Sequence, residues 1–193
     1  MNSEKHKRIV QFLFEIGTMR KLPRMHRQLF LFDDMTDNIA THSYRVALIG
    51  WFLAKLEGAD PYKVSMMCLM HDMSEIRTGD HNWLHKRYTK IFEEEIKEEQ
   101  LGTLPFPEMK EIADEYEKRE SKEAVVAKDA DMIDQVFLLR EYVWQGNKEA
   151  EKWLRKVNIF ERFKTESARA IAHAAMLEPP SSWWDNLATD KNR

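Results

Sequence analysis

The sequence contains few of the features that mark secreted or membrane-spanning proteins. Among its 193 residues there is one cysteine, Cys68, so no internal disulfide can form, and its apolar neighbours predict a buried thiol in a reducing compartment. No apolar stretch approaches the roughly 18–20 residues that span a bilayer. The first residues lack the apolar run of a signal peptide. These absences predict a cytoplasmic protein with no membrane partner.

Glycine and proline are also scarce, at six residues each, which leaves little room for long flexible linkers. The net charge of −3 provides no basic field, and the sequence contains no basic helix or aromatic platform for nucleic acid. We therefore expect no nucleic-acid partner. What the chain does contain is 43% hydrophobic and 33% charged residues. This composition is typical of a globular protein and predicts one domain over residues 1–193.

Apolar residues recur at three- and four-residue steps, and no segment alternates with the period of a strand, so the sequence predicts an all-α fold. Gly58 is expected to end one helix, and Asp60 and Pro61 to begin the next. A loop is expected over residues 21–37, C-terminal helices over 148–177 and a poorly ordered tail over 178–193. The expected helices cover residues 4–16, about 38–57, 61–71, 90–101, 107–119, about 121–145, about 148–156 and 161–177.

Ionisable residues within apolar helix faces are the informative features. His42 follows Ile39 by three residues and precedes Val46 by four, so it lies on their apolar stripe. A lone core histidine is more often structural than a metal ligand. The pair His71-Asp72 arrives where another apolar helix ends, but such a dipeptide is a weak signal by itself.

Asp131 is the strongest single signal, because it shares a helix face with Ala124 and Ala127. A buried carboxylate without a partner is costly, so it must become neutral or find a cation. Asp129 lies on roughly the opposite side of this helix and is expected to be solvated. Asp134 is expected either to support a ligand from behind or to pair with a lysine.

One divalent metal ion would satisfy His42, His71, Asp72 and Asp131 together. Two imidazole nitrogens and two carboxylate oxygens suit Mn, Fe, Co, Ni or Zn, and the donor types do not separate these metals. Five- or six-coordination would leave a position for water, which is typical of a catalytic rather than a structural site.

The order His42, His71-Asp72, Asp131 resembles the H…HD…D signature of the HD-domain phosphohydrolase superfamily. Residues 71–75 and 78–80 resemble the HD-x-x-E…x-G-D stretch of the 5′-deoxynucleotidase branch. Residues 128–131 resemble the second aspartate motif of that branch. The resemblance covers about residues 20–147, the expected core of the domain.

This resemblance implies an HD-domain helical bundle, a single divalent metal held by the four residues above, and release of phosphate from a small nucleotide. It implies that Glu75 is the catalytic acid or the water-positioning group, that Asp80 lies beside the substrate and that Arg24 contacts phosphate. Proteins of this kind are often homodimers, so we expect a homodimer. Lys86 is a further candidate phosphate contact, whereas Arg77 and Arg87 are more simply explained as surface cations.

The sequence differs from the 5′-deoxynucleotidase branch at positions that the resemblance places near the substrate. The residues after Asp80 lack the branch's prolines, and Met25 follows Arg24 where one branch has tryptophan. His81 and His85 are four residues apart, and a phosphate-contacting or exposed role is favoured over a second metal site.

The hypothesis favoured by these residues is a (deoxy)nucleoside 5′-monophosphate phosphatase. An HD-type nucleoside triphosphate hydrolase and a non-catalytic nucleotide-binding HD protein stay open as alternatives.

Overall fold

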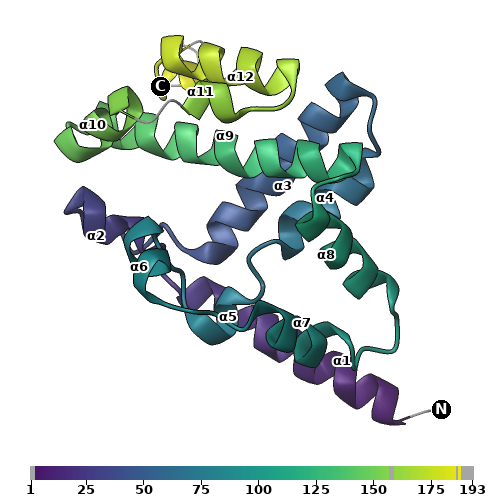
Figure 1. Ribbon diagram of the computed structural model, residues 1–193. Coiled ribbons are helices and arrows are strands. Elements are labelled where there is room, and N and C mark those ends of the chain that lie inside the picture. Colours follow the sequence, from purple (N-terminus) through teal and green to yellow (C-terminus); the bar gives the residue numbers. More distant parts are fainter. Residues whose placement is uncertain (1–2, 157–158, 186, 188–193) are drawn as a thin grey trace.

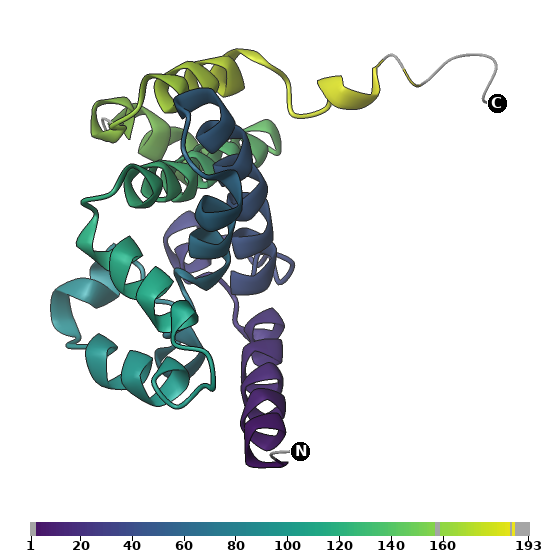
Figure 2. The same ribbon diagram turned by 90° about the vertical axis from the view of Figure 1, so that its right-hand side faces the viewer.

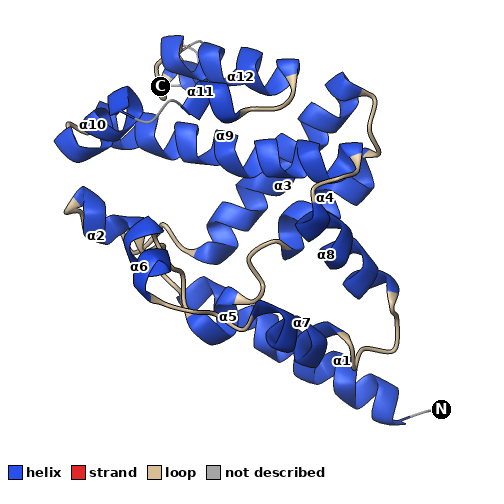
Figure 3. Ribbon diagram, in the orientation of Figure 1, coloured by secondary structure: helices blue, strands red, loops and turns tan. Residues whose placement is uncertain are grey.

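The computed structural model describes residues 3–156, 159–185 and 187. Within these residues the chain forms helices and no strand (Figure 3), apart from an isolated antiparallel bridge between Pro23 and Asn38. The all-α prediction is therefore confirmed. Part of the predicted tail, residues 186 and 188–193, lies outside the described residues, and the single-domain prediction stays a prediction.

The first half of the chain forms α1 (Ser3–Ile16), the 3₁₀ helix η1 (Gly17–Lys21), α2 (His26–Phe30), α3 (Ile39–Glu57), α4 (Pro61–Met70), α5 (Glu75–Thr78) and α6 (Trp83–Tyr88). The second half forms α7 (Glu93–Leu101), α8 (Glu108–Lys118), α9 (Lys122–Trp144), α10 (Lys148–Lys156), α11 (Ile159–Arg162), α12 (Glu166–Leu177) and η2 (Ser182–Trp184). Figure 2 shows α1 at the lower end of the molecule, where Arg8 donates to the carbonyl oxygen of Gln100 in α7. No helix in the described part of the chain is both long and apolar enough to cross a membrane.

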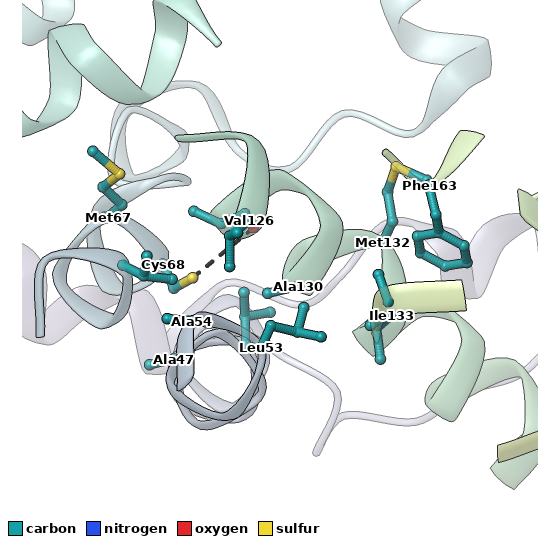
Figure 4. Close-up of a cluster of buried hydrophobic side chains, with 14 of the residues drawn as sticks. Ala47, Leu53, Ala54, Met67, Cys68, Val126, Ala130, Met132, Ile133 and Phe163 are labelled. Atoms are coloured by element: carbon teal, nitrogen blue, oxygen red, sulfur yellow. Dashed lines mark hydrogen bonds between the residues drawn. The ribbon is translucent and has the colours of Figure 1, made fainter. Parts of the chain in front are cut away.

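The long helix α9 is the centre of the fold. It crosses α3 and also packs against α4, α8, α10 and α12 (Figure 1). The contact faces of α3, α4 and α9 form a core of fully buried side chains (Figure 4) that includes Leu53, Val64, Cys68, Val126 and Ile133. The predicted burial of Cys68 is confirmed. The crossing of α3 and α4 is close, because a Cβ at Gly50 would lie 2.7 Å from the Cys68 sulfur.

The predicted ends of α3 and α4 are confirmed by their capping groups. Asn38 and Thr41 form a reciprocal capping box at the start of α3, and Gly58 ends this helix in the left-handed region at φ 68°. The Asp60 side chain accepts the backbone N–H groups of Tyr62 and Lys63 at the start of α4. These caps place His42 in the first turn of α3 and His71 directly after α4.

Several short helices were not predicted. The expected loop 21–37 contains α2, and residues 83–88, to which no helix was assigned, form α6. Helices this short are marginal in isolation, so tertiary contacts decide whether they form. Phe30 of α2 is 2% exposed and Asn82, the cap of α6, is fully buried, so both segments are held by packing that sequence periodicity does not report.

The expected helix 161–177 is divided into α11 and α12, and Asp129 is the physical reason. Its carboxylate accepts the backbone N–H groups of Lys164 and Thr165 at 3.0 and 2.7 Å, and the Thr165 hydroxyl at 2.7 Å. These amides belong to the break between the two helices. Asp129 is 1% exposed, so the prediction that it is solvated was wrong.

Candidate metal centre and its cleft

The four predicted metal ligands meet where α3, α4 and α9 come together. The Nε2 atoms of His42 and His71 lie 3.2 Å apart. Asp72 Oδ2 lies 3.4 Å from the first nitrogen and 3.1 Å from the second. Asp131 Oδ1 lies 3.4 and 3.7 Å from the same two nitrogens. The ligand atoms of His42, His71 and Asp72 all fall within 4.8 Å of one another, a spacing that suits one metal ion.

The outer nitrogens of both imidazoles are occupied, which fixes the orientation of the rings. His42 Nδ1 donates to Asp134 Oδ2 at 2.6 Å, and His71 Nδ1 donates to the carbonyl oxygen of Cys68 at 2.7 Å. With the proton on Nδ1, each ring presents an Nε2 lone pair to the centre, as metal-binding histidines do. Asp134 also pairs with Arg45, which rules out its expected lysine partner and leaves the supporting role.

The carboxylates of Asp72 and Asp131 favour positive charge on the two imidazoles of the centre. Burial lowers the pKa of His71, but the Asp72 charge and the hydrogen bonds that Asp131 and Asp72 accept from the imidazole raise it to about 9. Burial raises the pKa of Asp131, yet Lys128 and the two histidines hold it well below its usual range. The metal-free centre therefore keeps protons on its histidines, and a metal ion would replace those protons. The donor set of two imidazoles and two carboxylates fits a divalent transition metal.

Glu75 lies near the four predicted ligands, but it belongs to a different helix from the one that leads to His71. It follows His71 by four residues, which would be about one turn if the helix continued. Instead α4 ends at Met70, a series of turns follows, and Glu75 is the first residue of α5. Its Oε2 atom is buried and has no hydrogen-bond partner among the described residues. Burial, together with the charges of Asp72 and Asp80, raises the pKa of Glu75 to about 10.

Arg24 is buried beside this carboxyl group. It is 7% exposed, and its Nε lies 3.8 Å from Asp80 Oδ2. Its Nε and Nη1 atoms have no hydrogen-bond partner in the described part of the chain. Burial lowers the pKa of Arg24, but the carboxylates of Asp72, Asp80 and Asp131 outweigh this effect and raise it. A buried guanidinium with free donors is suited to binding an anion.

The carboxylate of Asp80 contacts neighbouring protein groups and does not simply face the open cleft. Its Oδ2 accepts the backbone N–H of Met25 at 2.5 Å, in addition to facing Arg24. The bridge between Pro23 and Asn38 holds the same segment at the start of α3. Asp80 therefore positions Arg24 and the chain around it.

One cleft of about 370 Å³ is lined by Arg24, His71, Asp72, Glu75, Asp80 and Asp131, whereas His42 and Asp134 lie behind it. Lys86 lines it as well, whereas Arg77 and Arg87 do not: Arg77 pairs with Glu15 and Glu99, and Arg87 is exposed. His81 lines the cleft, and its ring meets that of His85 edge-on at 5.7 Å.

Sequence reasoning missed three further cations on the cleft. Lys128 lies 2.6 Å from Asp131 Oδ2, and its place one turn before Asp131 was a usable signal. Arg119 adopts a left-handed backbone at φ 56° at the end of α8, and Arg162 ends α11. Nothing local in the sequence links these two arginines to the centre, because they come from separate helices.

Comparison with known proteins identifies the family. Residues 19–174 match the HD domain family, which is most of the chain. The chain belongs to the HD domain family. The family resemblance stated from the sequence is thus confirmed.

Individual relatives agree with this assignment. This HD domain is 30% identical over 122 residues to a Dictyostelium discoideum protein named 5′-deoxynucleotidase HDDC2, covering 56% of this chain and 64% of that protein, less than two thirds of its length. It is 26% identical to the Bos taurus protein of the same name, covering 77% of this chain and 74% of that protein. A solved structure of a conserved hypothetical protein from Pyrococcus furiosus has the same fold, with a TM-score of 0.72, 24% identity and coverage of 88% and 99%.

Proposed function

We propose that this HD domain is a metal-dependent phosphatase of (deoxy)nucleoside 5′-monophosphates. The observation that carries the proposal is the cleft itself. The His-Asp centre, the buried carboxyl group of Glu75 and the buried guanidinium of Arg24 surround one space of about 370 Å³, and two nitrogens of that guanidinium have no hydrogen-bond partner among the described residues. The names of the Dictyostelium and Bos taurus relatives, both 5′-deoxynucleotidase HDDC2, support the substrate class.

His42, His71, Asp72 and Asp131 would hold the metal, with Mn, Co, Fe, Ni or Zn all compatible with these donors. When bound, such a metal supplies Lewis-acid activation of water and neutralises charge on phosphoryl oxygens. Asp134 and the Cys68 carbonyl hold the two imidazoles with Nε2 facing inward.

Arg24 and Lys86 would bind the substrate phosphate. Arg24 has free donors and is already desolvated, so it loses little on binding an anion. Asp80 would keep Arg24 in place. Glu75 carries a carboxyl group that can move a proton, and its location in the cleft suits donation to the leaving 5′ oxygen.

A nucleoside triphosphate hydrolase is the second candidate, because Arg119, Lys128 and Arg162 add positive charge around the same cleft. A longer phosphate chain would use these cations, whereas a monophosphate needs fewer. Product analysis separates the two: monophosphatase activity releases orthophosphate from monophosphates, and the alternative releases pyrophosphate or successive phosphates from triphosphates.

The test of the proposal is elemental analysis of the purified protein, followed by a phosphate-release screen. The screen uses nucleoside mono-, di- and triphosphates with added Mn, Co, Ni, Zn or Mg. We expect orthophosphate from monophosphates in the presence of a transition metal. Nucleotide binding without release of any phosphate would instead identify a non-catalytic nucleotide-binding protein.

We also propose a homodimer in the cytoplasm. Four apolar residues recur every fourth position on α3 and are exposed by 48–65%: Tyr44, Leu48, Phe52 and Leu56. An exposed stripe of this kind suits a protein–protein contact. Light scattering should give the mass of a dimer, and Phe52→Glu should give a monomer. A wild-type monomer at micromolar concentration would reject the dimer.

A further inference from the structure

An apolar hollow of about 440 Å³ adjoins the cleft of the metal centre. Trp83, Trp153 and Arg162 line both spaces, so the two form one continuous trough. The part near the centre is lined by charged side chains. The other part is lined by Leu29, Phe30 and the two tryptophans, with Glu149 and Lys152 at the same hollow.

Trp153 is a rigid wall of the trough. Its ring meets His26 edge-on at 5.3 Å and lies against Phe30 at 5.1 Å. Phe30 is 2% exposed and packs in turn on Tyr142 at 5.6 Å. His26 also lines the metal cleft, so the wall runs without interruption from the charged part to the apolar part. An indole that is already fixed loses little entropy when a ligand packs against it.

Trp83 is held in position although 58% of it is exposed. It is the first residue of α6, and its neighbour Asn82 is fully buried. The Asn82 side chain accepts two backbone N–H groups of α6 and donates to the Met25 carbonyl and to Gln28 Oε1, each at 3.0 Å. Asn82 therefore fixes α6 against the chain around α2, and an indole is presented at the edge of the hollow.

We propose that this hollow is the base subsite, in which Trp83 and Trp153 contact the planar base of the nucleotide. The inference rests on the proposed function and deepens it. A nucleoside monophosphate has a charged end and a planar aromatic end, and the two parts of the trough match these ends. Aromatic side chains bind any base through its π-face, so recognition here is tolerant of base identity.

The polar groups of the hollow support this tolerance. Lys152 Nζ and Glu149 Oε2 are paired with each other at 2.8 Å, which leaves Arg162 as the polar side chain of the hollow without an ion-pair partner among the described residues. Few groups are thus available to read the edge of a base. Contact area then decides affinity, and we expect purine nucleotides to bind more tightly than pyrimidine nucleotides.

The experiment compares a nucleotide with the same phosphate ester lacking the base. Trp83→Ala and Trp153→Ala are assayed with deoxyadenosine 5′-monophosphate and with deoxyribose 5-phosphate. Stacking on one aromatic side chain is worth roughly a 5- to 100-fold change in binding, so we expect KM for the nucleotide to rise by about that factor. Turnover of deoxyribose 5-phosphate should stay within about twofold of wild type. Trp144→Ala is the matched control, since Trp144 is also 58% exposed and lines neither space.

A binding measurement makes the test independent of catalysis. Deoxyadenosine, which has no phosphate, is titrated into metal-free protein while tryptophan fluorescence is followed. Saturable quenching that is lost in Trp83→Ala and retained in Trp144→Ala supports the base subsite. An equal loss of turnover on both substrates, or quenching unchanged in both cleft variants, overturns it. Wild-type protein that quenches with deoxyadenosine but releases phosphate from no substrate would reject the phosphatase function and keep the base subsite.

Discussion

Two carboxylates two residues apart on α9 meet opposite kinds of partner. Asp129 accepts two backbone amides and a hydroxyl from the break between α11 and α12. Asp131 faces the Nε2 atoms of His42 and His71 at 3.4 and 3.7 Å. The amides complete their hydrogen bonding within the protein, whereas the imidazole nitrogens can exchange a proton for a metal ion. Burial of a carboxylate alone therefore does not identify a functional site; the chemistry of its partner does.

The largest contrast is expected in metal binding. Asp131→Ala should lose bound metal and phosphate release, because it removes a direct ligand; the loss of affinity should exceed the roughly 10- to 100-fold typical of groups behind the ligands. Asp129→Ala should retain the metal. Elemental analysis of both variants after gel filtration measures this. Equal metal content in Asp131→Ala and wild type would remove Asp131 from the ligand set.

A substitution at Glu75 tests whether proton transfer can be lost while metal binding is kept. Glu75→Gln keeps the shape of the side chain but cannot move a proton, so we expect turnover to fall by about 10²-fold, the usual scale for a general acid or base. Metal content and nucleotide affinity should be unchanged. Wild-type turnover would exclude Glu75 as the acid–base group, and loss of the metal would make it a ligand.

Asp134 is expected to act through His42 and not on the substrate. Asp134→Asn weakens the group that orients the imidazole, and loss of such support typically costs roughly 10- to 100-fold in metal affinity. Competition with a fluorescent chelator measures the affinity. Because the effect is on metal binding, saturating metal should restore turnover in this variant. Turnover that stays low at full occupancy would contradict the positioning role.

Removal of the metal should change the Tm of the Asp129 and Asp131 variants differently. A ligand present at about 100 times its dissociation constant stabilises the folded state by about 2.7 kcal/mol. For a chain of this length that corresponds to a shift in Tm of roughly 5–10 °C. Chelation should therefore lower Tm equally in wild type and Asp129→Ala, but leave Asp131→Ala unchanged. An equal shift in all three proteins would mean that chelation acts elsewhere.

The smallest effect is expected for Asp129 itself. Asp129→Ala leaves the amides of Lys164 and Thr165 without their acceptor. A buried donor left unsatisfied costs about 1–3 kcal/mol, and because both residues are partly exposed we expect about 1 kcal/mol for each. Urea unfolding should show a loss of about 2 kcal/mol in the free energy of unfolding, with the metal retained. Stability equal to that of wild type would show that water replaces the carboxylate.

Predictions from the sequence succeeded where the deciding contacts are local. The capping groups Asn38, Gly58 and Asp60 act within four residues of themselves, so the ends of α3 and α4 could be read directly. The positions of His42 and Asp131 on apolar helix faces are also a local property. Together with the HD motif they identified the residues that the structure brings together in the centre.

Local patterns failed for the short helices and for the surroundings of the centre. His42 and Asp134 are 92 residues apart in the sequence, and Asp129 and Thr165 are 36 apart, so no periodicity relates these pairs. The same holds for Trp83 and Trp153, which share a trough although they lie on α6 and α10.

The sequence by itself determined the helical class, the ends of the long helices and the chemistry of the metal-binding side chains, because each depends on neighbours within one or two helical turns. The tertiary structure alone decided which backbone amides Asp129 accepts, which cations line the cleft and which aromatic rings adjoin it. The physical reason is that a side chain's free energy in the folded protein depends on the groups it meets across helix contacts. Those groups are brought together by the packing of α3, α4 and α9 and of the short helices around them.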